Sequence, residues 1–93
     1  MKKIVIWFGL FLFIISVNIE AQRIRGIDLL GFAKKLFEEG FYSIALGQFK
    51  QFLNDHPESE SVYIAQYYVG ECYFRMNDFK NASEEFLILT AHP

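Results

Sequence analysis

Hydrophobic residues recur at helical spacing in the middle of the chain and predict a first amphipathic helix. Gly40 follows this pattern, and glycine is the usual residue where a helix ends in the left-handed conformation. The predicted helix begins near Asp28, an anion suited to the first turn, and ends near Glu39, after a short lead-in at residues 24–27. Its apolar face falls at positions i, i+3, i+4 and i+7, which are Leu29, Phe32, Ala33 and Leu36.

Three further helices are predicted between turn signals, at about residues 42–54, 62–76 and 79–90. The first of these stops before Pro57, because proline disfavours the helical conformation in the residue before it. Asn77 suits the turn between the other two, since asparagine tolerates the left-handed conformation. No segment alternates apolar and polar residues between turn signals, so no strand is predicted. The expected fold is all-α, with antiparallel helices joined by short loops.

The helical pattern occurs twice, 37 positions apart, as the numbers of Ala45 and Ala82 show. Each copy ends in a His-Pro pair, at His56-Pro57 and His92-Pro93. A fixed period between about 20 and 50 residues is typical of a repeat array. This favours a binding scaffold over an enzyme. The other matched pairs are Ala33 with Gly70, Leu36 with Tyr73, Phe37 with Phe74, Tyr42 with Phe79, and Phe49 with Phe86.

The N-terminal segment has a different pattern. Two lysines follow the initial methionine, and residues 4–17 are almost entirely apolar. This layout is that of a secretory signal peptide, whose apolar core spans about 7–15 residues and is shorter than the roughly 18 residues of a membrane-spanning helix. Ala21 offers the small residue before a cut, although Ile19 occupies a position where a second small residue is preferred. We expect a signal peptide at 1–21 and a mature part at 22–93; the alternative is an uncleaved anchor.

Charge and cysteine content narrow the class of protein further. Removal of the signal peptide leaves 7 basic and 10 acidic residues, because Lys2, Lys3 and Glu20 are lost from totals of 9 and 11. The resulting net charge of −3 is typical of a soluble surface and argues against a nucleic-acid partner. Cys72 is the single cysteine, so no intramolecular disulfide can form, and no cysteine follows Ala21 to carry a lipid anchor.

The two copies resemble the tetratricopeptide repeat, a helix–turn–helix unit of about 34 residues with small residues where its helices cross. The resemblance covers residues 26–93, with repeat 1 at about 26–59 and repeat 2 at about 63–93. It implies an α-solenoid of about two repeats, with the three-residue surplus of the period in the loop at 57–61. The residues expected to pack the repeats are Leu29, Phe32, Ala33, Leu36, Ala45, Phe49, Phe52, Gly70, Tyr73, Ala82, Phe86 and Leu89.

The longer period and the signal peptide are similar to those of periplasmic repeat proteins of the bacterial cell envelope, such as outer-membrane assembly lipoproteins and Tol–Pal-associated proteins. The resemblance implies an exported, periplasmic or envelope-associated scaffold with a protein or peptide partner and no cofactor. In this family the first helices of the repeats form a concave face that binds the partner. The matching positions here are Leu30, Lys34, Phe37, Tyr67, Glu71, Phe74 and Arg75.

Aromatic, cysteine and histidine residues of the chain also have interpretations that involve no binding site. Phe37 and Phe74 are suited to packing between repeats, because aromatic stripes at helical spacing are more often core. Cys72 is expected to be a small buried hydrophobe rather than a reactive thiol. His56 and His92 stand alone beside prolines, without the spacing of a metal-ligand set, and are expected to be loop residues. No nucleophile motif, phosphate-binding loop or paired carboxylate indicates catalysis.

The sequence also fits two broader alternatives. The segment fits the N-terminal adaptor of a larger enzyme or transport-associated protein, or a membrane-anchored adaptor that keeps residues 4–17. Residues 86–89 of the last predicted helix are a continuous apolar run. Repeat arrays need about three or more units and a polar capping helix, so we expect further repeats of the same chain and marginal stability or association of residues 22–93 alone.

Overall fold

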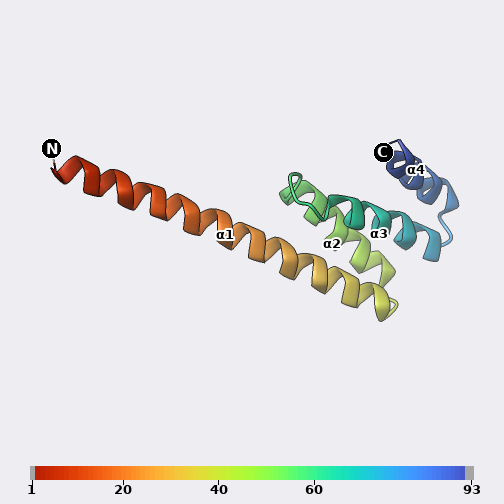
Figure 1. The fold of residues 1–93 in the computed structure, drawn as a ribbon. Helices are drawn as coiled ribbons and strands as arrows, with labels where there is room; N and C mark the ends of the chain where they lie inside the picture. Colours follow the sequence, from red (N-terminus) through yellow and green to blue (C-terminus); the bar gives the residue numbers. More distant parts are fainter. Residues whose placement is uncertain (1, 92–93) are drawn as a thin grey trace.

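Four α-helices form a stack in which each helix packs mainly against the next one along the chain (Figure 1). The computed structural model describes residues 2–91, except for the side chains at 2–5, 16, 17, 19 and 22. No strand occurs among these residues, and the all-α prediction is confirmed for them. The helices are α1 (Lys2–Glu38), α2 (Tyr42–Asp55), α3 (Val62–Arg75) and α4 (Phe79–Thr90). We call α1 with α2 the first hairpin, and α3 with α4 the second hairpin.

α1 is much longer than predicted, with 37 residues. It continues without a break through residues 24–27, so the expected lead-in is wrong, and Asp28 lies inside the helix instead of near its start. The physical reason is that this segment contains no proline, and a single glycine such as Gly26 costs a helix only about 1 kcal/mol relative to alanine. The N-terminal part of α1 extends away from the other three helices (Figure 1).

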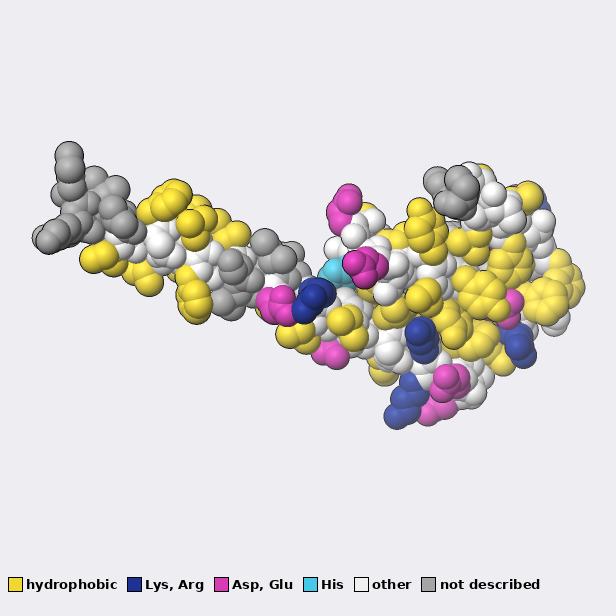
Figure 2. Space-filling view, in the orientation of Figure 1, with side chains coloured by type: hydrophobic (Ala, Val, Ile, Leu, Met, Phe, Trp, Pro, Cys, Tyr) yellow, Lys and Arg dark blue, Asp and Glu magenta, His cyan; other side chains and the backbone are white. Residues whose placement is uncertain are grey.

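The extended part of α1 exposes bulky apolar side chains between residues 6 and 15 (Figure 2). Trp7 is 72% exposed there. The expected cut after Ala21 falls inside α1, whereas the side chains of Ile19 and Gln22, which bear on that prediction, lie outside the described residues. Within the described part of the chain, no helix carries an apolar window long enough to count as a membrane span.

The turns that close α1 and α3 have the same backbone hydrogen bonds. After α1, the N–H groups of Gly40 and Phe41 donate to carbonyl oxygens three and five residues back, at 3.0 and 2.9 Å. After α3, those of Asn77 and Asp78 do the same, at 3.0 and 2.9 Å. Gly40 has a φ of 88° and Asn77 a φ of 64°, the left-handed conformation that was predicted for both. The repeat in the sequence is therefore also a repeat in turn geometry. The second His-Pro pair, at residues 92–93, lies outside the described residues.

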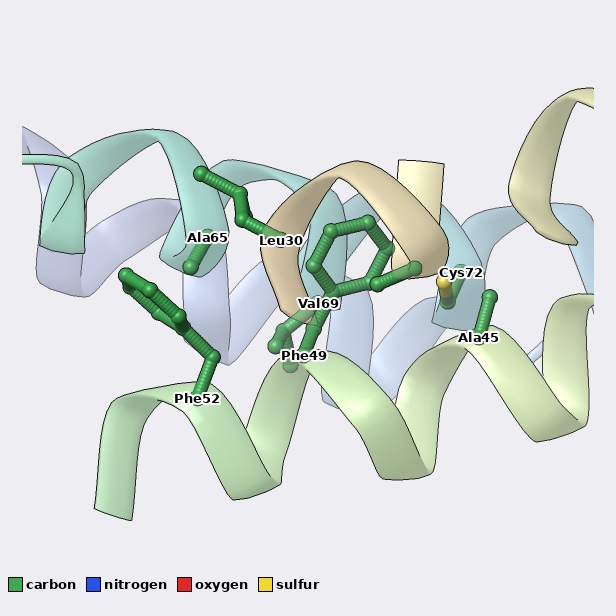
Figure 3. Close-up of a cluster of buried hydrophobic side chains, with 8 residues drawn as sticks. Leu30, Ala45, Phe49, Phe52, Ala65, Val69 and Cys72 are labelled. Carbon is green, nitrogen blue, oxygen red and sulfur yellow. The ribbon is translucent and has the colours of Figure 1, made fainter. Parts of the chain in front are cut away.

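The best-buried part of the core lies between α2 and α3. Phe49 and Phe52 of α2 are 0% and 1% exposed. Three small side chains of α3, Ala65, Val69 and Cys72, are equally buried and lie near these rings (Figure 3). Large rings on one helix against small side chains on the other allow close packing. Each buried phenylalanine contributes about 1.5–3 kcal/mol relative to an exposed one.

The residues expected to pack the repeats divide by exposure. The buried group is Ala33, Ala45, Phe49, Phe52, Gly70 and Ala82. The half-buried group is Leu29, Leu36, Tyr73, Phe86 and Leu89. Phe32 is 53% exposed, so the expectation that it packs is wrong. Its counterpart 37 positions on, Val69, is buried against the hairpin that precedes α3, whereas no described helix precedes α1 to cover Phe32.

Candidate partner-binding face

An aromatic cluster joins α1 to α3 on the face formed by the first helices of the two hairpins. The ring of Phe37 meets Tyr68 edge-on, with centroids 5.2 Å apart and an interplanar angle of 75°. Tyr68 also stacks on Phe49, at 4.9 Å and 6°. Aromatic pairs of these kinds contribute about 0.5–1.5 kcal/mol beyond the area they bury. The cluster therefore fixes the relative position of the two helices that form this face.

Two cations lie over these rings, one from each helix. The Nζ atom of Lys34 is 5.9 Å from the ring centroid of Tyr68, and the guanidinium carbon of Arg75 is 5.8 Å from that of Phe37. Arg75 Nε is 3.9 Å from a carboxylate oxygen of Glu71, and the Arg75 side chain is 51% exposed. Exposed cation–π contacts contribute about 0.5–1 kcal/mol, enough to orient the cations while they remain open to solvent. The face can thus offer positive charge beside an aromatic surface.

The structure brings together five of the residues expected on the partner face, which are Lys34, Phe37, Tyr67, Glu71 and Arg75. Tyr67 and Phe74 of α3 are 47% and 49% exposed. The Tyr67 ring is 5.5 Å from that of Tyr68 and 6.2 Å from that of Phe86, so it lies between the cluster and α4. The Phe74 ring is 5.4 Å from that of Phe79 and lies toward α4. Phe37 packs against the core, as the packing interpretation expected, whereas Phe74 keeps half of its surface exposed.

Leu30 does not belong to this face. It is only 7% exposed and is part of the hydrophobic core, so the expectation that it lines the partner surface is wrong. Leu30 lies three residues before Ala33, which is fully buried, and this spacing places both on one face of α1. Its counterpart Tyr67 lies three residues before Gly70 but is 47% exposed.

Tyr68, the residue at the centre of the face, was not among the predicted partner-binding residues. A signal for it was present in the sequence. Tyr68 lies three residues before Glu71 and seven before Arg75, so the three share one face of α3. The apolar pattern of α3 fits either Tyr68 or Val69, and only the packing of α3 on the first hairpin distinguishes them: Val69 is buried, and Tyr68 is half-buried at the rim.

Cys72 lies beneath this face and is 0% exposed. Burial, assisted by the negative charge of Glu71, raises the pKa of its thiol to about 11. The thiol is therefore protonated at neutral pH, and a protonated thiol is a poor nucleophile. These properties agree with the expectation of a small buried hydrophobe.

A separate hollow of about 610 Å³ lies between α1 and the loop after α2. His56 in this loop is half-buried, and its ring comes so close to Gly26 that a Cβ atom there would lie 3.2 Å from Nδ1. Gly26 thus permits the loop to approach α1, and His56 acts as a packing residue. Among the described residues, no three His, Cys, Asp or Glu side chains lie close enough together to hold a metal ion; His92 is outside this set.

No family model matches the chain, and neither a curated protein nor a solved structure matches it.

Proposed function

We propose that this chain is an exported helical-repeat module of the tetratricopeptide type that binds a protein or peptide partner in the bacterial cell envelope. The partner lies on the face formed by α1 and α3. The observation that carries the proposal is the Phe37–Tyr68 contact with a cation over each ring. A preorganised aromatic surface flanked by oriented cations is typical of sites that contribute most of the energy of an interface.

The repetition of local structure supports the repeat-module part of the proposal. The two hairpins share the 37-position sequence period and the same hydrogen-bonded turn after their first helix. Stacked hairpins present their first helices side by side, which forms a continuous surface for an extended segment or a helix. The open position of Arg75 and the half-exposed Tyr67 fit such a surface.

The partner face is tested by site-specific photo-crosslinking in cells that express the full chain. A benzoylphenylalanine at Tyr67, which is 47% exposed on α3, is expected to capture a discrete partner. The double variant Lys34→Ala/Arg75→Ala in the same chain should lose this product, because it removes both cations. The matched control Lys35→Ala/Lys80→Ala removes two exposed cations that do not lie over these rings, and should keep it. An equal amount of the crosslinked product from both double variants would contradict the proposed partner face.

Export is tested separately by mass spectrometry of the protein recovered from the envelope fraction. The proposal expects an N-terminus at Gln22. The continuity of α1 past residue 21 favours a second candidate, an adaptor that keeps residues 4–17 as a membrane anchor. An N-terminus at Met1 would support that second candidate and rule out the cleaved form, without affecting the partner face.

A further inference from the structure

The proposed cut after Ala21 creates a new first turn of α1. α1 is helical through this segment in the uncut chain, so the mature chain begins with residues that are already helical. Arg23, Ile24 and Arg25 are exposed, whereas Gly26 is buried against the ring of His56. The turn that carries the new N-terminus is therefore open to solvent up to Gly26 and is held to the rest of the chain only from there.

Glutamine has a particular reactivity when it becomes the first residue of a chain. Inside the chain, the backbone nitrogen of Gln22 is an amide; after the cut it is a primary amine and a nucleophile. This amine attacks the side-chain carbonyl carbon Cδ, so that a bond forms between the α-nitrogen and Cδ. The bond from Cδ to Nε2 breaks, one proton passes from the α-nitrogen to Nε2, and ammonia leaves. Every reacting atom belongs to Gln22, and the product is the five-membered lactam pyroglutamate.

The charges of this turn favour the lactam over the free amine. A helix N-terminus carries a partial positive charge, so cations there are unfavourable. Arg23 and Arg25 already place two cations in the turn, and a free α-ammonium would add a third. Arg23 hydrogen-bonds to Glu20 in the uncut chain, but the cut removes Glu20, and no acidic residue precedes Asp28 in the mature part. Cyclisation removes one of the three positive charges.

The backbone at this position tolerates the ring. The first N–H groups of a helix have no partner within the helix. Proline is favoured at the first helical position, because its ring closes on the backbone nitrogen at no loss of a hydrogen bond there. The lactam also closes a five-membered ring on the backbone nitrogen. The helix that follows, from Arg23 onward, can therefore keep its hydrogen bonds after the reaction.

We infer that Gln22 is a modification site, at which the mature chain is converted to pyroglutamate in the cell. The inference rests on the proposed export, because only the cut after Ala21 supplies the reactive amine. The modified chain has no free α-amine, and it resists aminopeptidases that recognise one. The exposed first turn of α1 is thereby protected from stepwise degradation towards Gly26, where the packed part of the chain begins.

The inference is tested on the full chain expressed in cells and recovered from the envelope fraction. Free amines are labelled by reductive methylation at once, and cleavage before Asp28 then releases the N-terminal peptide of residues 22–27. Mass spectrometry should find this peptide unlabelled and lighter than its calculated mass by one ammonia molecule. The control Gln22→Ala cannot cyclise, and its peptide should appear at full mass with a labelled α-amine.

The possible failures of the inference and of the proposed export differ in this experiment. A labelled peptide of residues 22–27 at full mass would overturn the inference and leave the cut after Ala21 in place. A free amine at recovery that disappears only on storage would also overturn it, because the reaction would then not occur in the cell. An N-terminus at Met1 would overturn both the modification and the cleavage.

Discussion

The two hairpins carry the same pattern of residues but differ in what covers them. Phe49 and Phe52 of the first hairpin are 0% and 1% exposed, whereas their counterparts Phe86 and Leu89 of the second are only half-buried. α3 covers the first hairpin, and no described helix covers the second. Equivalent positions therefore belong to the core in the first hairpin and are partly exposed in the second. In a stack of this kind, burial depends on the neighbouring repeat as much as on the residue itself.

The largest expected effect comes from truncating the equivalent rings. Phe49→Ala should lower the free energy of unfolding by about 3–5 kcal/mol, because it leaves a cavity between α2 and α3. Phe86→Ala should cost clearly less, roughly half, since its ring is already partly in water. Urea unfolding of the full chain followed by circular dichroism measures both. Equal losses of unfolding free energy in the two variants would show that the ring of Phe86 is as well buried as that of Phe49.

A smaller effect distinguishes the two turns. Gly40→Ala should destabilise the chain by about 1–2 kcal/mol, because a Cβ atom is unfavourable at a φ of 88°. Asn77→Gly at the equivalent turn should be neutral or slightly stabilising, since asparagine there already holds a φ of 64°. The same unfolding assay applies. A loss in Asn77→Gly as large as that in Gly40→Ala would argue that the Asn77 side chain, not its backbone conformation, stabilises the turn.

The hairpins also differ in how their second helices begin. Asp78 caps α4 by accepting a hydrogen bond from the N–H of Asn81 at 3.3 Å, whereas Phe41 at the start of α2 makes no side-chain cap. Asp78→Ala should therefore cost about 1 kcal/mol. Both Phe41→Asp and Phe41→Ala lose the apolar contacts of the Phe41 ring. Phe41→Asp should lower the stability less than Phe41→Ala does, because the new carboxylate can cap α2. Thermal melts of the three variants measure these differences; a neutral Asp78→Ala would contradict the role assigned to the cap.

The smallest expected effect is a pH dependence from Cys72, which faces the covered hairpin. Its pKa is about 11 in the folded chain and near 9.0 when exposed, so unfolding at pH values between these releases a proton. Stability should therefore be unaffected below about pH 8 and fall as the pH rises toward 11, by less than about 1 kcal/mol at pH 9.5. Urea titrations at pH 8 and 9.5 test this against Cys72→Ala, which should lack this component of the loss. An identical loss of stability in the original chain and in Cys72→Ala would show that other titrating groups cause the pH dependence.

The sequence predicts the helices of this fold better than it predicts which neighbours cover their faces. The ends of α2, α3 and α4 follow from Pro57, Asn77 and the apolar spacing, which act locally. The exposure of Phe32 and the burial of Leu30 did not follow, because periodicity tells which residues share a helix face but not which neighbour covers it. Tyr68 was missed for the same reason: its role depends on contacts with two rings of the other hairpin.

Hydrogen–deuterium exchange of the full chain tests most directly whether the second hairpin is less well covered than the first. Backbone amides of α2 around Phe49 should exchange only on global unfolding, whereas those of α4 around Phe86 should exchange at least about tenfold faster through local opening. Protection of α4 equal to that of α2 in the chain alone would contradict the claim that the second hairpin is open.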